Sequence, residues 1–422
     1  MKKLTAVIVG YGDRGYAYGT YSVDHPEELA IVGVAEPNPV RRETAQKRHN
    51  IPADGLYTSW EDLATQPKMA DFAIIGTQDN MHYAPALALI DKGYHLLLEK
   101  PMAPNPQECK GITEAAEKKG VKVVVCHVLR FTQFWRTIKS IIDSGRLGRI
   151  MSVIGMENVG HTHQSHSFVR GHWRNSKEST CMIMAKCCHD MDIYQWILGK
   201  KCKQVQSFGS LGHFTKENQP EGAPDRCIEG CPVADTCYYN AVKLYCESDN
   251  VWFRRTAAKT NEMPTDEQVV EAIKNGPYGR CVYACDNDVV DHQVVNLEYD
   301  DGCTLSFTMN AFNGGGRNVR IFGTKGELVS SRDEKTLELY TFDTCQWEKI
   351  EIDRVGNDIT SGHGGGDTGI MVDILSLLRG ETPSDSICEV RTSYENHITG
   401  FAAEESRLTG KVVSIEEYEK GL

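Results

Sequence analysis

The chain has 422 residues, of which 40% are hydrophobic and 25% charged, an ordinary globular composition that at this length predicts two domains. Its 46 Lys and Arg against 58 Asp and Glu give a net charge of −12, which excludes the basic surface typical of nucleic-acid binders. No stretch reaches the roughly 18 apolar residues of a membrane helix, and the first apolar run ends at Gly10 without a cleavage signal. We therefore expect a cytoplasmic protein with neither nucleic-acid nor membrane partners.

A glycine-rich turn follows the first predicted strand. The apolar run Leu4 to Val9 leads directly into Gly10-Tyr11-Gly12-Asp13-Arg14-Gly15, a G-x-G-x-x-G pattern. Such glycines allow a tight turn, close approach of the backbone to a pyrophosphate and close packing of the next helix. A second apolar strand, Ile31 to Ala35, ends at Glu36, at the spacing of an acid that binds the adenosine ribose. The pattern predicts a dinucleotide site whose residues are Gly10, Gly12, Asp13, Arg14, Gly15 and Glu36.

The acid at position 36 also bears on which dinucleotide binds. A carboxylate there accepts hydrogen bonds from the ribose hydroxyls and repels the 2′-phosphate of NADP. Arg41 and Arg42 follow closely and could attract that phosphate instead. We expect NAD, with NADP as the less favoured alternative.

The alternation of strands and helices continues to residue 128. Further strands are predicted at Phe72 to Gly76, Tyr94 to Leu98 and Val121 to Cys126. This order predicts a doubly wound parallel sheet of the Rossmann type in an α/β domain over 1–128, with ligands beyond the carboxyl ends of its strands. The residues expected to contact the cofactor at those ends are Thr77, His82, Glu99 and Lys100.

The pattern changes in residues 129–422, where we predict an α+β domain that binds the substrate and forms the oligomer. Asp300-Asp301-Gly302 is a hairpin signal between two alternating segments. The predicted strands are Val294 to Tyr299, Thr304 to Ala311, Val319 to Phe322 and Leu337 to Tyr340, which predict a large, mostly antiparallel sheet. Near the C-terminus, Asp367 is expected to cap a helix whose apolar stripe is core or interface.

Several of the 15 cysteines gather in an insertion at about 213–285. Cys227, Cys231 and Cys237 form a C-x3-C-P-x4-C pattern. Three thiols this close can converge on zinc or an iron–sulfur cluster, and the alternative is a set of buried free thiols. The residues that could supply a fourth ligand are Cys188, Cys246, Cys281 and Cys285. A metal held here would fix the insertion as a lid over the active site.

Further motifs bring the chain close to a known family. They are Leu129-Arg130-Phe131, Ser144 to Gly148, His189-Asp190-Met191-Asp192, Gly323 to Glu327 and Ala403 to Ser406, besides the glycine turn, Glu36, Thr77, His82 and Glu99-Lys100-Pro101. Together they resemble the Gfo/Idh/MocA family, relatives of glucose–fructose oxidoreductase and inositol dehydrogenase, over nearly the whole chain. The resemblance implies NAD-dependent hydride transfer between nicotinamide C4 and a hydroxyl or keto carbon of a sugar, sugar acid or cyclic polyol. It also implies a homo-oligomer, a dimer or a tetramer.

The resemblance assigns catalytic roles to Lys100 and His189. His189 lies on a helix predicted from Lys186 to Leu198, and from the residues alone it would be a histidine of the core. In the family pattern it takes the proton of the substrate hydroxyl, while Lys100 hydrogen-bonds the same oxygen. The chain departs from this pattern four residues before the histidine, where Ala185 replaces the usual Asp and Lys186 follows. The departure leaves room for an anionic substrate or a rarer reaction.

Substrate contacts are expected from Lys186 and from the segment that precedes the catalytic helix. We predict that His163, Arg170 and Trp173 line a polar pocket for a small carbohydrate, with the arginine as a clamp for a carboxylate or phosphate. The alternate spacing of His161 and His163 also allows a metal pair on one face of a strand.

Two other functions are compatible with these motifs. One is a redox-assisted glycosidase that retains NAD and acts through a transient keto-sugar. The other is a non-catalytic sensor of a dinucleotide or sugar, which the presence of both Lys100 and His189 disfavours.

Overall fold

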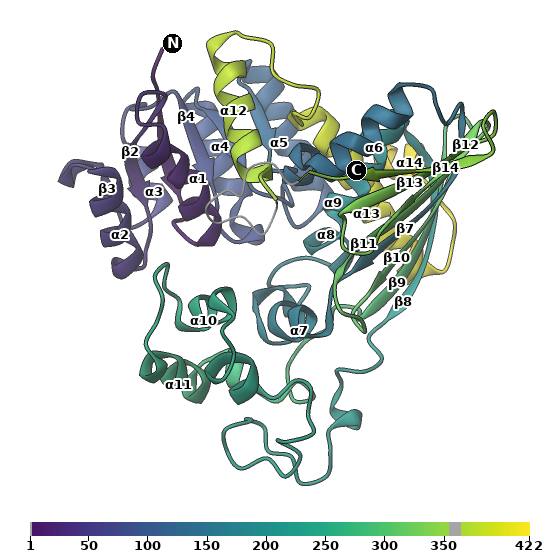
Figure 1. Cartoon of the computed structure of the whole chain (residues 1–422). Coiled ribbons are helices and arrows are strands. Elements are labelled where there is room, and N and C mark those ends of the chain that lie inside the picture. Colours follow the sequence, from purple (N-terminus) through teal and green to yellow (C-terminus); the bar gives the residue numbers. More distant parts are fainter. Residues whose placement is uncertain (1, 354–363) are drawn as a thin grey trace.

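The computed structural model describes residues 2–353 and 364–422. Two sheets organise the chain, a parallel one in the N-terminal part and a larger mixed one in the remainder (Figure 1). The insertion lies below both in this view, apart from either sheet. The predicted combination of a Rossmann domain with a second, largely antiparallel domain is therefore confirmed.

The first sheet contains six parallel strands in the order β3-β2-β1-β4-β5-β6. They are β1 (Leu4–Val9), β2 (Leu29–Ala35), β3 (Leu56–Tyr57), β4 (Phe72–Ile75), β5 (His95–Leu98) and β6 (Val123–Val125). All residues of β4 and β6 are buried, because helices cover both faces of the sheet. The apolar runs of the sequence follow from this two-sided burial.

The helices of this domain are α1 (Asp13–Asp24), α2 (Pro39–His49), α3 (Trp60–Thr65), α4 (Tyr83–Asp91) and α5 (Pro106–Lys119), with 3₁₀ turns at η1 (Ala53–Gly55), η2 (Asp79–Met81) and η3 (Val128–Phe131). Helix α5 shows why they begin and end where they do. The Asn105 side chain accepts a hydrogen bond from the Glu108 N–H, Pro106 occupies the first turn, and Gly120 ends the helix in the left-handed conformation. Helices α4 and α5 pack on one face of the sheet, and α1 and α2 pack on the other.

A helix from the C-terminal part completes the cover of the parallel sheet. Ile370, Met371 and Ile374 of α12 (Gly366–Arg379) are buried in the same core as α1. The prediction that Asp367 caps this helix is wrong, because the cap residue is Gly365 and Asp367 lies in the first turn. The helix therefore carries an acidic side chain to the start of α1.

The second sheet has nine strands in the order β14-β13-β12-β11-β7-β10-β9-β8-β15. They are β7 (Ile150–Asn158), β8 (Cys202–Ser210), β9 (His292–Tyr299), β10 (Thr304–Asn310), β11 (Gly316–Gly323), β12 (Gly326–Ser330), β13 (Thr336–Thr341), β14 (Gln346–Glu351) and β15 (Val413–Ser414). Neighbouring strands are antiparallel except β7 and β10, and β9 pairs with β10 as the predicted hairpin. Gly302 takes a φ of +84° in its turn, a conformation that favours glycine.

One face of this sheet is covered by helices, of which α9 and α13 supply most of the buried apolar side chains. The elements are α6 (Gln133–Asp143), α7 (His161–His163), α8 (Met182–Ala185), α9 (Cys188–Leu198), α13 (Val390–Thr409) and α14 (Ile415–Lys420), with a π-helical turn at η4 (Gln164–Arg170) and a 3₁₀ turn at η5 (His172–Arg174). His161 and His163 lie on a helical turn, which excludes the alternative of a metal pair on one face of a strand.

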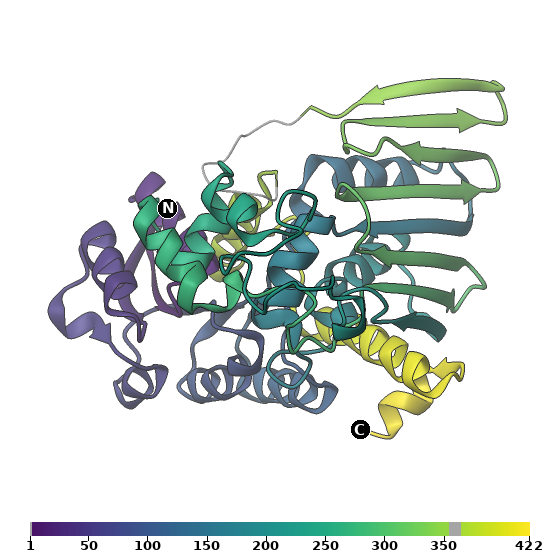
Figure 2. The same cartoon turned by 90° about the horizontal axis from the view of Figure 1, so that it is seen from below.

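The insertion contains short helices joined by irregular loops. They are η6 (Lys216–Asn218), η7 (Val242–Cys246), α10 (Val251–Ala258), α11 (Asp266–Asn275) and η8 (Pro277–Gly279). Tyr245, Phe253 and Tyr278 form part of a small core of its own. Seen from below, the insertion lies across the junction of the two domains (Figure 2). Among the described residues, no helix combines the length and apolarity required to cross a membrane.

Candidate functional site

The glycine turn between β1 and α1 has the shape expected of a pyrophosphate cradle. A Cβ on Gly15 would lie 2.1 Å from the carbonyl oxygen of Gly10, and one on Gly10 would lie 2.9 Å from that of Gly76. These two glycines therefore let the strand, the turn and the helix pack closely. At Gly12 the nearest atom to such a Cβ is 3.7 Å away, on the Arg41 guanidinium. The turn thus keeps open space at the N-terminus of α1, where backbone N–H groups bind phosphates.

Glu36 lies at the end of β2, is buried, and has both carboxylate oxygens fixed by backbone amides. The N–H of Tyr11 donates to Oε2 over 2.7 Å and the N–H of Asn38 donates to Oε1 over 2.8 Å. Arg42 donates to the carbonyl of Glu36 over 2.5 Å, whereas Arg41 faces the glycine turn. The carboxylate is therefore held beside the glycine turn, as a ribose-binding acid requires.

Arg14 and Glu99, both predicted to contact the cofactor, form an ion pair with a distance of 2.7 Å. Tyr18 donates to the same Glu99 oxygen, and Asp367 accepts from the Arg14 guanidinium over 2.5 Å. Burial acts to raise the pKa of Glu99, but the Arg14 charge, the hydrogen bonds from Arg14 and Tyr18 and the Lys100 charge together outweigh it, and the net shift is downward. This buried network joins α1, the end of β5 and α12, so Asp367 is a member that the sequence analysis did not identify.

The ends of β4 and β5 are linked by His82. Its ring nitrogens lie 2.8 Å from the carbonyl oxygen of Pro101 and 3.2 Å from that of Thr77. Thr77 donates in turn to the carbonyl of Met81. These contacts fix the rim that carries Lys100.

Lys100 reaches from this rim to the second domain. Its Nζ donates to the backbone carbonyl of Ala185 over 2.8 Å, at the end of α8. His189, buried in the first turn of α9, lies a few residues beyond that carbonyl, and its ring centroid is 6.0 Å from that of His127. Lys100 and His189 thus come from two domains, and a main-chain carbonyl binds the lysine at the position where the family pattern has an aspartate.

A buried polar network lies behind His189. Asp192, one helical turn further on, accepts two hydrogen bonds from Arg130 and one from Asn396. His127 lies 3.7 Å from the same carboxylate and contacts the Ser393 hydroxyl over 2.9 Å. Asp192 and Arg130 belong to motifs visible in the sequence, but nothing in the sequence marks His127 or Asn396.

Lys186 lies in a group of two cations and two anions. Its Nζ is 3.4 Å from Glu157, which is also 2.6 Å from Arg317, and Arg317 is 2.8 Å from Asp190. Burial raises the pKa of Asp190 to about 6, against the lowering effect of Arg317. The charge of Lys186 is therefore balanced within the protein rather than directed alone at the site.

Two of the predicted substrate residues lie near this centre. Burial and the charge of Lys186 hold the pKa of His163 well below its usual range, and Lys100 adds to this effect. Trp173 donates its indole N–H to the buried carboxylate of Asp79 over 2.9 Å. Asp79 follows β4, so this bond attaches the segment after η4 to the Rossmann rim.

Arg170 lies elsewhere, among the cysteines of the insertion. Its side chain is fully buried and donates to the carbonyls of Arg280 and Tyr239 over 2.7 and 2.6 Å. Cys227, Cys231 and Cys237 come together beside it, as predicted, and Cys281 joins them around a small cavity. The structure therefore brings the four cysteines together and separates Arg170 from Lys100 and His189.

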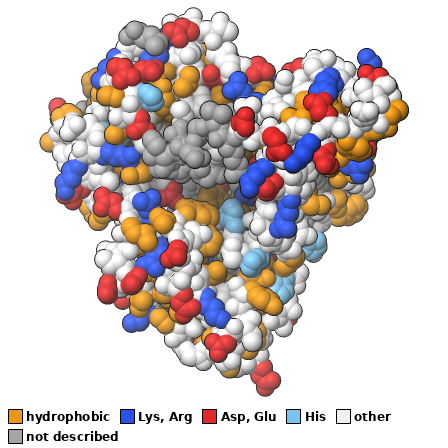
Figure 3. All heavy atoms as spheres, in the orientation of Figure 1, with side chains coloured by type: hydrophobic (Ala, Val, Ile, Leu, Met, Phe, Trp, Pro, Cys, Tyr) orange, Lys and Arg blue, Asp and Glu red, His pale blue; other side chains and the backbone are white. Residues whose placement is uncertain are grey.

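The insertion also reaches the cofactor side of the Rossmann domain. The Asn38 side chain, next to Glu36, lies 3.5 Å from the carbonyl oxygen of Lys259. Burial raises the pKa of Tyr278, and the Asp13 carboxylate on α1 adds to the increase. Histidine and hydrophobic side chains are visible where the three parts meet (Figure 3).

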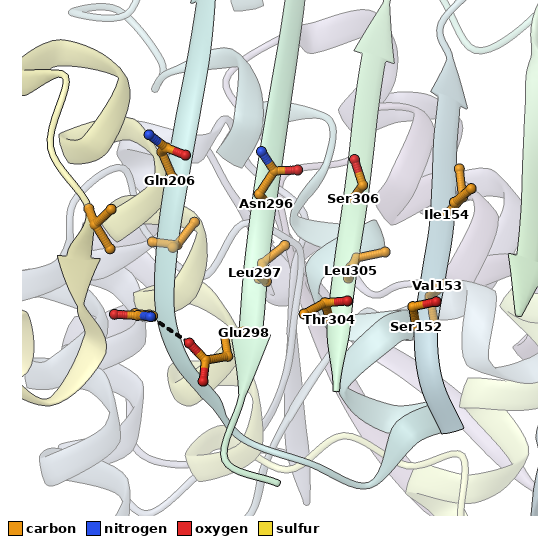
Figure 4. Close-up of a pocket in the computed structure, with 13 residues that line it drawn as sticks. Ser152, Val153, Ile154, Gln206, Asn296, Leu297, Glu298, Thr304, Leu305 and Ser306 are labelled. Carbon is orange, nitrogen blue, oxygen red and sulfur yellow. Dashed lines mark hydrogen bonds between the residues drawn. The ribbon is translucent and has the colours of Figure 1, made fainter. Parts of the chain in front are cut away.

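A separate groove lies on the open face of the nine-stranded sheet. Figure 4 shows Gln206, Asn296 and Ser306 pointing to this face, with Leu297 and Leu305 on the buried side. None of the residues predicted to act on cofactor or substrate lines this groove.

Comparison with known proteins agrees with this geometry. A Gfo/Idh/MocA model described as "Oxidoreductase family, NAD-binding Rossmann fold" matches residues 4–127, and its companion, "Oxidoreductase family, C-terminal alpha/beta domain", matches residues 139–415. The Bacillus subtilis protein named "Putative oxidoreductase YteT" is 26% identical over 323 residues, 72% of each chain. Inositol 2-dehydrogenase of Salmonella typhimurium is 25% identical over 206 residues, 49% of this chain and 57% of its own. The WlbA dehydrogenase of Bordetella pertussis, solved with NADH and UDP-GlcNAcA, shares the fold with a TM-score of 0.68, at 17% identity over 98% of each chain.

Proposed function

Because the chain belongs to the Gfo/Idh/MocA oxidoreductase family, we propose that it is an NAD-dependent dehydrogenase of a sugar, sugar acid or cyclic polyol. The observation that carries the proposal is the bond from Lys100 to the Ala185 carbonyl. This bond holds an ammonium group beside the helix of His189, at the rim where the family binds a nicotinamide.

The residues of the first domain fit a bound NAD. The turn at Gly10, Gly12 and Gly15 offers backbone N–H groups to the pyrophosphate, and Glu36 is held for the ribose hydroxyls. NAD supplies the hydride acceptor, nicotinamide C4. Glu36 supports NAD over NADP, because the 2′-phosphate of NADP would lie against a buried carboxylate.

The chain's own residues account for the proton. As the substrate C–H bond gives up its hydride, the hydroxyl proton passes to a ring nitrogen of His189 and a carbonyl group forms. Lys100 donates a hydrogen bond to the same oxygen and stabilises the negative charge that develops on it. Asp192 and Arg130 hold α9 against the first domain, so they position the histidine.

We propose that residues next to Lys100 and His189 select the substrate. His163 is neutral there and can accept or donate a hydrogen bond, and Lys186 and Trp173 border the same region. We propose a homo-dimer or homo-tetramer as the working assembly, which light scattering of the purified protein would test.

A second reaction, glycoside cleavage with retained NAD, is supported by the position of the insertion. The contact of Lys259 with Asn38 places the insertion against the segment after Glu36, where it would slow release of a bound dinucleotide. An enzyme that releases NADH each turnover gains nothing from slow release, whereas a redox-neutral cycle does.

One experiment tests both reactions. Purified protein is denatured to identify bound cofactor and is then assayed with inositols, aldoses, uronic acids and glycosides in the presence of NAD. Steady formation of NADH with one substrate class supports the dehydrogenase. Glycoside cleavage without net NADH supports the redox-neutral reaction, and no turnover of any class removes both.

A further inference from the structure

Four cysteine side chains surround one small cavity in the insertion. Cys227, Cys231 and Cys237 come from a single loop, and Cys281 comes from the segment after η8. The cavity has room for about one water molecule. Burial raises the pKa of the Cys237 thiol, and the neighbouring thiols of Cys227 and Cys231 raise it further.

A buried cation faces the same cavity. The Arg170 guanidinium lies 3.7 Å from the Cys227 sulfur through Nη2, and its Nη1 has no hydrogen-bond partner among the described residues. An unbalanced charge of this kind is costly inside a protein. Nearby, Asp286 pairs instead with Arg174 and Arg280, so no described carboxylate is bonded to Arg170. A negative charge in the cavity would balance the guanidinium.

The spacing of the sulfurs bears on what the cavity holds. A single zinc ion binds each thiolate at about 2.3 Å, which leaves no room for a water-sized space between four sulfurs. The described residues include two sets of three or more ligand atoms within 4.8 Å of one another, His127 with Asp192 and Cys388, and His25 with Glu27 and Glu28. The cysteines form neither set, so their sulfurs are spread more widely than the ligands of one ion.

We propose that Cys227, Cys231, Cys237 and Cys281 bind an iron–sulfur cluster, whose negative charge is balanced by Arg170. The wide spacing favours a [4Fe–4S] cluster, in which each thiolate binds a different iron. Metal binding deprotonates the thiols, so four thiolates replace four neutral groups around the guanidinium. Of the possible fourth ligands, Cys281 lines the cavity. The others lie elsewhere: Cys285 packs against a neighbouring apolar cluster, Cys246 packs in the helical part of the insertion, and Cys188 lies beside His189.

The cluster would act as a structural clamp. It joins the loop of residues 227–237 to the segment at Cys281, which encloses α10 and α11 between its two anchors. The enclosed stretch also contains Lys259 and Tyr278, the residues next to Asn38 and Asp13. No electron transfer is required for this role.

The test uses the whole protein purified without oxygen. We expect about four iron and four sulfide per chain, with the broad visible absorption of such clusters. The variants Cys231→Ser and Cys281→Ser should lose both to background, while the matched control Cys246→Ser, in the same insertion, should keep them. Arg170→Met should lower the retained iron, and Arg170→Lys should restore part of it.

A labelling experiment on the unaltered chain guards against misfolded variants. Iodoacetamide should modify the exposed Cys345 at once, but Cys227, Cys231 and Cys237 only after the cluster is removed. One zinc per chain in place of iron would overturn the cluster, and absence of any metal together with ready labelling would overturn the site. Disulfides between these cysteines in freshly purified protein would overturn it as well.

Discussion

In the Rossmann domain the strands bury side chains on both faces, whereas the insertion, all of whose residues are described, contains no β-strand. Its helices bury few side chains: α11 contributes only Val269 and Ile273 to a core. A segment of this size with so small a core requires another source of stability. The two regions therefore differ in what stabilises them: the Rossmann domain has an extended core, whereas the insertion has a small core with aromatic stacking, to which the proposed cluster would add a cross-link.

The largest effect is expected from the rim of the Rossmann domain. Lys100→Met should lower turnover by about 10³-fold, because the oxygen that becomes a carbonyl loses its charged donor. NAD binding should change little, since the glycine turn and Glu36 are unaltered. Turnover is measured by NADH formation and NAD affinity by calorimetry, with Lys118→Met on the exposed end of α5 as the control. Equal losses of turnover and NAD affinity would assign Lys100 to cofactor binding instead.

A smaller effect is expected at the ribose. Glu36→Ala removes an acceptor bonded by two backbone N–H groups, and NAD affinity should fall roughly 10- to 100-fold. The affinity for NADP should rise relative to the affinity for NAD, because Arg41 would then face the 2′-phosphate without a neighbouring carboxylate. Binding of each cofactor is compared with that of Glu61→Ala, an exposed change on α3. An unchanged NAD to NADP ratio would contradict the assignment.

The Rossmann domain could be predicted from the sequence because the signals that specify it are local. The glycine turn, Glu36 and the cap at Asn105 each lie within a few residues of the element they specify. Asp367 contacts Arg14, and Cys281 lies beside the cysteine loop. Both contacts join segments far apart in the sequence, so the spacing of residues does not predict them. His161 and His163 lie on the three-residue turn α7, directly before the π-helical turn at η4, and alternate spacing of two residues does not distinguish so short a turn from a strand.

The smallest effect concerns the stability of the insertion in acid. His166 is stacked between Phe253 and Tyr278, with centroid distances of 4.3 and 4.8 Å, and bonds to the Tyr245 hydroxyl. Burial lowers its pKa from 6.5 to about 3, with a contribution from Arg170. The unfolded chain therefore binds the proton first, and the stability present above pH 6.5 is lost as the pH falls toward 3.

Replacing His166 measures how much of the loss of stability in acid is due to this residue. His166→Phe keeps the stacking and should remove up to about 1.4 kcal/mol per pH unit of acid sensitivity within that window. Thermal unfolding is followed between about pH 4 and about pH 7, the upper part of this pH range. The control is His25→Phe, on the exposed turn after α1. If both variants lose stability with the same pH dependence as the unaltered protein, His166 is not the group that titrates.

The most direct test of hydride transfer from the substrate to NAD, assisted by Lys100 and His189, is NADH formation by the purified protein across a panel of inositols, aldoses, uronic acids and glycosides. We expect NADH in proportion to oxidised product with one class of substrate, and its loss in Lys100→Met and in His189→Ala. NADH formation that persists in both variants would contradict the roles proposed for Lys100 and His189.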